Sequence, residues 1–246
     1  MRKIHVIFKK EDIQPNKLIG KQGVVFDVLM ATSIITFLLS KGARGIYPVE
    51  NEQEARRKCR QMPNSRFQLV GEDQGAPIKD FLLPSTTLLQ NVSMDLPFIL
   101  STTNGTVALR RSRKAKRLFA SSLLNNKYVA EVLVESKEDI IIICAGSSGS
   151  YNMEDFLGAG HLIEHLVELE QFDLTDAAKT ALFFYQGKRG DVMDVLKETR
   201  IGQIFMKYGL DAEIDYVSRV NTERVIPIVQ PDGWIVNQVN VGVRKG

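Results

Sequence analysis

Short apolar segments with strand character alternate with helical segments along this chain of 246 residues, and this alternation restricts its fold more than any other feature. Such alternation is typical of βαβ units, which assemble into a largely parallel sheet, so the expected fold class is α/β. Six of the predicted strands end on polar or acidic residues. Because the carboxyl ends of parallel strands meet at one edge of the sheet, beside helix N-termini that favour anions, the sequence predicts a ligand site there.

The order of strand, polar turn and helix recurs in the second half of the chain, which predicts a two-lobed α/β architecture. The predicted strands cover residues 4–8, 23–27, 46–50, 67–71, 97–101, 117–120, 139–144, 214–217, 225–229 and 234–243. The predicted helices cover residues 31–40, 52–61, 106–112, 127–135, about 153–170, 175–185, 191–198 and 201–208. Residues 72–95 contain two prolines and a Ser-Thr-Thr run, so we expect a loop there with room for one short helix.

The composition favours a cytoplasmic globular protein. The net charge is only +3, from 32 basic and 29 acidic residues, which is too small to indicate nucleic-acid binding by itself. The run at residues 110–117 is the one candidate nucleic-acid patch, and a solvated helix end is the favoured interpretation. The N-terminus lacks the apolar core of a signal peptide, and residues 31–39 are too few to cross a membrane. Two cysteines form no disulfide framework.

Carboxylates follow several of the predicted strands, and at an anion-binding edge they favour a hard cation such as Mg²⁺. The expected metal ligands are Asp27, Glu50, Glu72 and Glu154, and the expected catalytic carboxylates are Asp27 and Asp155. The alternatives are structural: Asp27 can serve as a turn or cap residue, and Glu50 can be solvated beside a helix cap at Asn51. The sequence therefore predicts a metal-assisted site for a small anionic molecule.

Two segments rich in hydroxyl and glycine residues are candidate phosphate-binding loops, STTNGT at residues 101–106 and CAGSSGS at residues 144–150. The expected substrate-binding residues are Thr102, Thr103, Asn104, Gly105, Ser121, Ser122, Gly146, Ser147 and Ser148. The first segment can also be an ordinary Asn-Gly turn. Cys144 is a candidate nucleophile, but no basic residue is adjacent in the sequence to lower its pKa, and a packing role is favoured.

His161, Glu164 and His165 match the H-x-x-E-H pattern of some zinc proteases, and both histidines fall on one helical face. The sequence indicates no third ligand, so a solvated helix face is the favoured interpretation.

Three motifs occur in one order, Asp-Val-Leu-x-Ala-Thr from Asp27, Thr-Thr-Asn-Gly-Thr from Thr102, and Cys-Ala-Gly-x-x-Gly from Cys144. With matching stretches at residues 42–56, 70–78, 121–130 and 209–229, the chain resembles the 2-phosphosulfolactate phosphatase family almost from end to end. The resemblance implies two similar α/β lobes, residues 1–96 and 97–246, that exchange C-terminal strands within one compact unit. It also implies Mg²⁺-dependent hydrolysis of 2-phosphosulfolactate to 3-sulfolactate and phosphate, a reaction of coenzyme M biosynthesis in methanogens.

The chain departs from the family pattern at three places. Met30 stands where the family usually has Arg, the loop at residues 72–87 lacks the usual continuation, and Asn221 replaces a common Asp. Loss of an arginine beside the site can weaken recognition of a phosphate or sulfonate. An alternative is therefore a non-catalytic homologue that binds a phosphorylated metabolite. The expected partner is a small phosphorylated hydroxy acid rather than a nucleic acid or a membrane, and a homodimer is an open option.

Overall fold

A single mixed sheet forms the centre of the computed structural model, which describes residues 1–63 and 65–238. The sheet has eleven strands in the order β5-β4-β6-β3-β11-β10-β7-β2-β8-β1-β9. In chain order they are β1 (Arg2–Ile7), β2 (Gln22–Phe26), β3 (Ile46–Val49), β4 (Gln68–Asp73), β5 (Ala76–Pro77), β6 (Phe98–Ser101), β7 (Arg117–Ala120), β8 (Ile140–Cys144), β9 (Phe172–Leu174), β10 (Pro227–Val229) and β11 (Ile235–Asn237).

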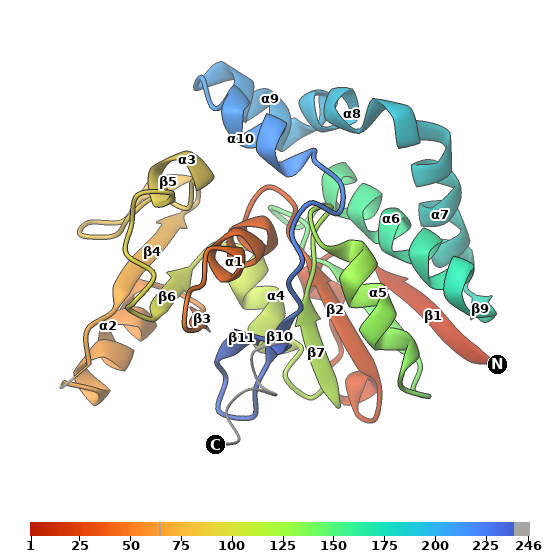
Figure 1. The fold of residues 1–246 in the computed structure, drawn as a ribbon, viewed down its shortest axis with the longest axis horizontal. Helices are drawn as coiled ribbons and strands as arrows, with labels where there is room; N and C mark the ends of the chain where they lie inside the picture. The colour runs from red at the N-terminus through yellow and green to blue at the C-terminus, as the bar shows by residue number, and fades with distance from the viewer. Residues whose placement is uncertain (64, 239–246) are drawn as a thin grey trace.

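Helices connect and cover the strands (Figure 1). They are α1 (Ala31–Ser40), α2 (Glu52–Gln61), α3 (Thr86–Leu89), α4 (Gly105–Arg111), α5 (Asn126–Val134), α6 (Met153–Leu169), α7 (Asp176–Lys188), α8 (Val192–Glu198), α9 (Arg200–Lys207) and α10 (Asp211–Val217). Helix α6 packs against both α5 and α7, with α6 on β2 and β8 and α7 on β1. In the described part of the chain, none of the helices combines the length and the apolar character that crossing a membrane requires.

Parallel strands form two groups in the sheet, β4-β6-β3 and β7-β2-β8-β1-β9. The antiparallel hairpin of β10 and β11 lies between them, because β10 pairs with β7 and β11 pairs with β3. The predicted α/β class with a largely parallel sheet is confirmed. The assignment of two similar lobes that exchange C-terminal strands stays a prediction.

Apolar runs in the sequence place β2 and β8 at the centre of the larger group. Every residue of both strands is buried, as expected for a parallel strand covered on both faces. Their carboxyl ends lie side by side, with Phe26 aligned with Cys144. The loops that follow Phe26 and Cys144 therefore begin at the same edge of the sheet.

One predicted strand is wrong. Residues 214–217 belong to helix α10, in which the buried Ile214 and Val217 are three positions apart, a helical rather than a strand spacing. Strand β9, with only three residues, was not predicted. The last predicted strand, residues 234–243, corresponds to β11, and its residues 239–243 lie outside the described residues.

Helices α8, α9 and α10 follow one another as an arch along the top of the view in Figure 1. We call this segment, residues 192–217, the helical cap. The cap is tied to α3, which lies between β5 and β6 in the chain, because Glu213 of α10 accepts hydrogen bonds from Ser85 and Thr86 at the start of α3. The cap therefore extends over the molecule from α7 to α3.

Candidate active site

Asp27 follows β2 directly and is only 5% exposed. The backbone N–H groups of Gly105, Ala31 and Met30 donate to its carboxylate. Burial raises the pKa of Asp27 to about 6, the negative charge of Glu72 adds to this rise, and the three N–H donors oppose it. The structure thus places a buried carboxylate at the predicted edge, where it also caps the turn that leads into α1, as the structural alternative expected.

Gly105 allows helix α4 to begin directly against this carboxylate. A Cβ atom at Gly105 would lie 2.5 Å from Oδ2 of Asp27 and 2.6 Å from Cβ of Ala31, closer than side chains can pack. Gly105, an expected substrate-binding residue, thus directs its N–H to the Asp27 carboxylate.

Glu72 lies near the end of β4 and is held by the STTNGT segment. The N–H of Thr103 donates to Oε1 of Glu72 at 2.7 Å, and the hydroxyl of Thr103 donates to Oε2 at 3.0 Å. The N–H of Gly75 also donates to Oε2, at 2.6 Å. The structure therefore brings Glu72, Thr103 and Asp27 to one region, as predicted from the strand ends.

Glu154 and Asp155 begin helix α6, and both are almost completely buried. Asp155 accepts the N–H of Val28 at 2.8 Å and the N–H of Gly146 at 3.1 Å, so it ties together the loops that follow β2 and β8. Burial raises the pKa of Asp155 well above its usual range, and the charges of Asp27 and Glu154 add to this rise. Asp155 is thus a positioning residue with both carboxylate oxygens in use.

Glu154 differs from its neighbour because its Oε1 atom is buried without any hydrogen-bond partner in the described part of the chain. Burial raises the pKa of Glu154 to about 7, and the charge of Asp27 adds to the rise, while a hydrogen bond from Thr199 and the charge of Arg200 oppose it. A buried carboxylate oxygen without a partner is unfavourable unless a proton, a cation or a ligand is nearby.

The loop after β8 is fixed by its own backbone. The N–H of Ser147 donates to the carbonyl of Ser150 at 2.9 Å, and the N–H of Ser150 donates back at 3.0 Å. Gly146 has a positive φ of 62°, and a Cβ there would lie 2.5 Å from the carbonyl oxygen of Ser150. Ser147 is buried, whereas Ser148 is exposed.

Several predicted site residues instead form hydrogen bonds to nearby backbone or side-chain groups, or are buried in the core. The hydroxyl of Thr102 accepts the N–H of Thr106 in the first turn of α4. Ser121 and Ser122 are both fully buried. The hydroxyl of Ser121 donates to Oδ1 of Asn126, and the N–H of Ser122 donates to Oδ1 of Asn125. Burial raises the pKa of the Cys144 thiol well above its ordinary value, and the carboxylates of Asp155 and Glu154 add to the rise, so the nucleophilic thiolate is disfavoured.

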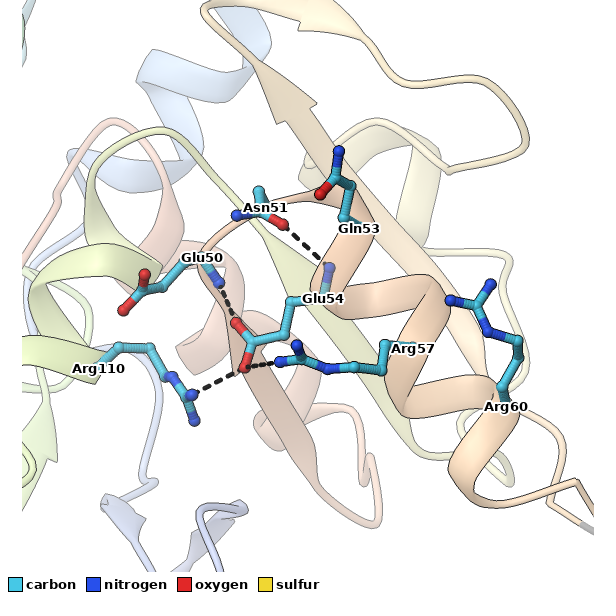
Figure 2. Close-up of a pocket in the computed structure, with 7 residues that line it drawn as sticks. All are labelled: Glu50, Asn51, Gln53, Glu54, Arg57, Arg60 and Arg110. Carbon is cyan, nitrogen blue, oxygen red and sulfur yellow. Dashed lines mark hydrogen bonds and ion pairs between the residues drawn. The ribbon is translucent and has the colours of Figure 1, made fainter.

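Glu50 lies in a separate open cavity of about 410 Å³ (Figure 2). Its N–H donates to Oε2 of Glu54 at 2.8 Å, and Oε1 of Glu54 accepts from Arg110 at 2.7 Å. Asn51 caps α2, as the alternative interpretation expected, because its side chain accepts the N–H of Glu54. In the chain as described, none of the contacts of Asp27 includes Glu50, so we leave Glu50 out of the proposed site.

The two histidines on α6 contact each other instead of presenting free lone pairs. The amide of Asn126 is oriented by Ser121, which donates to its Oδ1, and by the carbonyl of Gly158, which accepts from its Nδ2. Nδ2 of Asn126 also faces Nδ1 of His161 at 3.1 Å. Nε2 of His161 faces Nε2 of His165 at 3.0 Å and Nδ2 of Asn221 at 3.3 Å, so protein groups surround both ring nitrogens. His161 is buried, so the expectation of a solvated helix face is wrong for this residue.

The basic run at residues 110–117 is used within the fold. Each of its six cationic side chains donates a hydrogen bond within the fold. The acceptors are Glu54 for Arg110, the Lys10 carbonyl for Arg111, the Pro231 carbonyl for Arg113, Asn16 for Lys114, Glu138 for Lys116, and Gln22 and Gln238 for Arg117.

Three cationic residues that the motifs did not indicate come to the same edge. Nζ of Lys10, a buried residue, donates to Oδ1 of Asn104 at 2.8 Å, and Nζ of Lys9 donates to the carbonyl of Gly149 at 2.8 Å. Arg200 arrives from the helical cap. Because these residues lie far from the motifs along the chain, only the position of Lys9 and Lys10 after the first predicted strand could have indicated two of them.

The carboxylate oxygens of Asp27 and Glu72 are the type of donor that Mg²⁺ prefers. Oε1 of Glu154, another expected ligand, has no protein partner in the residues described. Within 1–63 and 65–238, groups of three or more acidic, histidine or cysteine side chains close enough to hold a metal ion are absent. This is compatible with Mg²⁺, which is commonly bound by one or two carboxylates together with water and substrate phosphate.

Comparisons with known proteins agree on one family. The family model described as 2-phosphosulpholactate phosphatase matches residues 7–232. A protein named "Probable 2-phosphosulfolactate phosphatase" from Clostridium beijerinckii is 30% identical over 92% of this chain and 95% of its own length. Proteins of the same name from Clostridium acetobutylicum and Clostridium perfringens are 31% and 33% identical, over 92% and 89% of this chain and 96% and 90% of their own lengths. The chain therefore belongs to the 2-phosphosulfolactate phosphatase family.

Proposed function

We propose that this protein hydrolyses a small anionic phosphate monoester, 2-phosphosulfolactate, to 3-sulfolactate and phosphate, with Mg²⁺ as cofactor. The names of its relatives and the family model support the substrate. One structural observation carries the proposal, the group of buried carboxylates around Asp27 that no ion pair neutralises in the described part of the chain. Such a group is favourable when it holds a cation against a phosphate.

Asp27 and Glu72 would hold Mg²⁺, since the charge of Glu72 raises the pKa of Asp27 in the absence of a cation. When bound, Mg²⁺ would neutralise phosphate charge and orient the attacking water. Thr103 would hold Glu72 in place, because both its N–H and its hydroxyl donate to that carboxylate. Lys10, whose Nζ donates to Asn104 and pairs with Glu11, would supply positive charge toward the phosphate as part of a preorganised electrostatic site.

Glu154 is the general base in this proposal. Its free Oε1 atom takes a proton from the attacking water while a bond forms from the water oxygen to phosphorus and the bond to the ester oxygen breaks. The proton can then reach the released hydroxyl group. A carboxylate with a pKa of about 7 is well matched to proton transfer near neutral pH.

The non-catalytic alternative is not favoured. Met30 and the altered loop at residues 72–87 motivated it. In the structure Met30 is a buried residue at the start of α1 whose N–H donates to Asp27, and Glu72, the first residue of that loop, acts on the same carboxylate.

Phosphate release from 2-phosphosulfolactate by the full chain tests the proposal. We expect activity that is lost on chelation with EDTA and restored by Mg²⁺. Asp27→Asn and Glu154→Gln should each lower kcat/KM by roughly 100-fold or more, because one removes a metal ligand and the other the base.

The matched control is Asp73→Asn, which removes an exposed carboxylate next to Glu72 on the same strand. Its kcat/KM should stay within about threefold of wild type. Full activity of Asp27→Asn would overturn the site assignment, and a wild-type chain that releases no phosphate with Mg²⁺ would overturn the function.

A further inference from the structure

Arg200 is the first residue of α9 and reaches from the helical cap to the loop after β8. Its Nη2 atom donates to the hydroxyl of Ser147 at 2.7 Å. Ser147 is 7% exposed, and its backbone is fixed by the paired hydrogen bonds with Ser150. The guanidinium group is therefore held over a rigid part of the candidate active site.

The turn that carries Arg200 is also fixed. Thr199 is 2% exposed, and its hydroxyl accepts the N–H of Gly202 at 2.9 Å, which caps α9. A Cβ at Gly202 would lie 1.8 Å from the carbonyl oxygen of Leu196, so only glycine allows this close turn between α8 and α9. The Thr199 side chain also bonds to Glu154, which places the start of α9 directly beside the proposed base.

Most donors of Arg200 are uncommitted. A guanidinium group carries five N–H donors, and in the described part of the chain Arg200 uses them for a single hydrogen bond, to an uncharged hydroxyl, and for no ion pair. The arginines that flank the cap differ, because Arg189 pairs with Glu164 and Arg219 pairs with Asp215. The cap thus presents one unneutralised guanidinium, and it lies at the site.

We propose that Arg200 is a specificity-determining residue that binds the second acidic group of the substrate, a sulfonate or a carboxylate, on the cap side of the site. This inference rests on the proposed function. The phosphate is assigned to the Asp27 side, where a cation is expected, so an acidic group two or three bonds away needs its own cationic partner. The planar fork of a guanidinium binds two oxygens of a sulfonate or carboxylate at once, which an ammonium group cannot do.

The experiment compares two phosphate monoesters with the full chain. One is 2-phosphosulfolactate, which carries further acidic groups, and the other is 4-nitrophenyl phosphate, which carries none. For Arg200→Gln we expect KM for 2-phosphosulfolactate to rise roughly 10- to 100-fold, with kcat changed less than about threefold, because a charge-assisted contact to a non-reacting group is lost. KM for 4-nitrophenyl phosphate should change less than about threefold. Arg200→Lys should rescue only part of the loss, since it restores the charge but not the fork.

The matched control is Lys207→Gln, which removes one positive charge from the exposed last turn of the same helix. It should leave both substrates unaffected, which separates a direct contact from a general change in charge. Equal losses for both substrates in Arg200→Gln, or an unchanged KM for 2-phosphosulfolactate, would overturn the proposal.

Binding of the product separates this inference from the proposed function. Titration calorimetry with 3-sulfolactate, which retains the second acidic groups but has no phosphate, requires no turnover. Weaker binding to Arg200→Gln than to wild type and Lys207→Gln would support the role of Arg200 even if the wild type releases no phosphate. Equal binding to all three chains would overturn it even in an active enzyme.

Discussion

At the scale of single residues, two glutamates show what separates a structural carboxylate from a reactive one. Glu213 and Glu154 are both 1% exposed. Burial alone would raise the pKa of Glu213, but hydrogen bonds from Ser85 and Thr86 outweigh it and hold that pKa below the ordinary value. Glu154 has one oxygen without such a partner in the described residues, and its pKa rises to about 7. Hydrogen bonding, not burial, distinguishes the two.

The His161 ring gives a prediction about pH. Burial lowers its pKa to about 3, and the charges of His165 and Arg189 add to the effect. Because the folded-state pKa lies below the unfolded value of 6.5, the neutral ring contributes fully to stability above pH 6.5, and this contribution is lost as the pH falls toward 3. His161→Gln should therefore reduce the loss of unfolding free energy between pH 6.5 and pH 5, at most by about 1.4 kcal/mol per pH unit.

Urea unfolding at several pH values measures this slope. His5→Gln is the control, because His5 is only half-buried and its pKa is also lowered, by burial and by Lys21 and Lys17. Its effect on the slope should be smaller. An unchanged slope in His161→Gln would show that His161 is protonated in the folded protein.

At the scale of elements, helices α6 and α7 are in close contact because Gly160 has no side chain. A Cβ at Gly160 would lie 2.1 Å from the carbonyl oxygen of Ala181 and 2.7 Å from Cβ of Tyr185. The contact, near the middle of α6, holds this helix in place, and α6 carries Glu154 and Asp155 in its first turn. Packing between two helices thus positions the acidic residues of the site.

Gly160→Ala should lower the free energy of unfolding by about 1–3 kcal/mol, because the helices must separate to admit the methyl group. Gly187→Ala is the matched control in α7, where a Cβ meets nothing within 4 Å. It should raise the free energy of unfolding by about 0.4–1 kcal/mol, since alanine restricts the unfolded chain. Thermal or urea unfolding measures both, and stabilisation by both substitutions would contradict the packing argument.

The sequence was most informative where a local pattern decides an element. The bounds of α1, α2 and β7 were predicted to the residue, since caps, proline and apolar spacing mark them. The failure at residues 214–217 has a physical reason. Four residues are too few to separate a period of two from a period of 3.6, and the hydrogen bonds of Glu213 that fix α10 join residues more than 120 positions apart.

At the scale of the whole molecule, the C-terminal hairpin joins the two groups of parallel strands. Ile228 of β10 is aligned with Phe119 of β7, and Ile235 of β11 is aligned with Ile46 of β3. Ile235 is fully buried. The described sheet is continuous only because this hairpin is present, so the two groups should not unfold separately.

Unfolding should therefore be a single transition in every probe. The chain has one tryptophan, Trp234, and it lies beside β11 in contact with Tyr47. Tryptophan fluorescence, which reports on the hairpin, and far-UV circular dichroism, which reports on the whole fold, should give the same urea midpoint. Ile235→Ala should lower the free energy of unfolding by about 2–5 kcal/mol and shift both urea midpoints down together. Separate midpoints would show that the hairpin detaches by itself.

The site could be predicted only in part, because contacts between segments far apart in the sequence bring some of its residues together. Asp27, Glu72 and Glu154 lie at or directly beside the ends of elements with clear local patterns, so their common edge followed from the α/β class. Arg200 comes from the cap, whose path over the edge depends on contacts between distant helices, and no local pattern contains that information. The position of Glu50 is local, since its N–H bonds to Glu54 four residues on, and the alternative with a cap at Asn51 anticipated it.

The short strands at the two ends of the described sheet have a consequence for self-association. The sheet ends at β5, which has two residues including Pro77, and at β9, which has three residues, with Asp173 paired to Lys3 of β1. Short edge strands that contain proline or charge offer little free backbone for pairing with another chain and protect against edge-to-edge aggregation. The described edges of the sheet therefore do not favour a dimer formed by extension of the sheet.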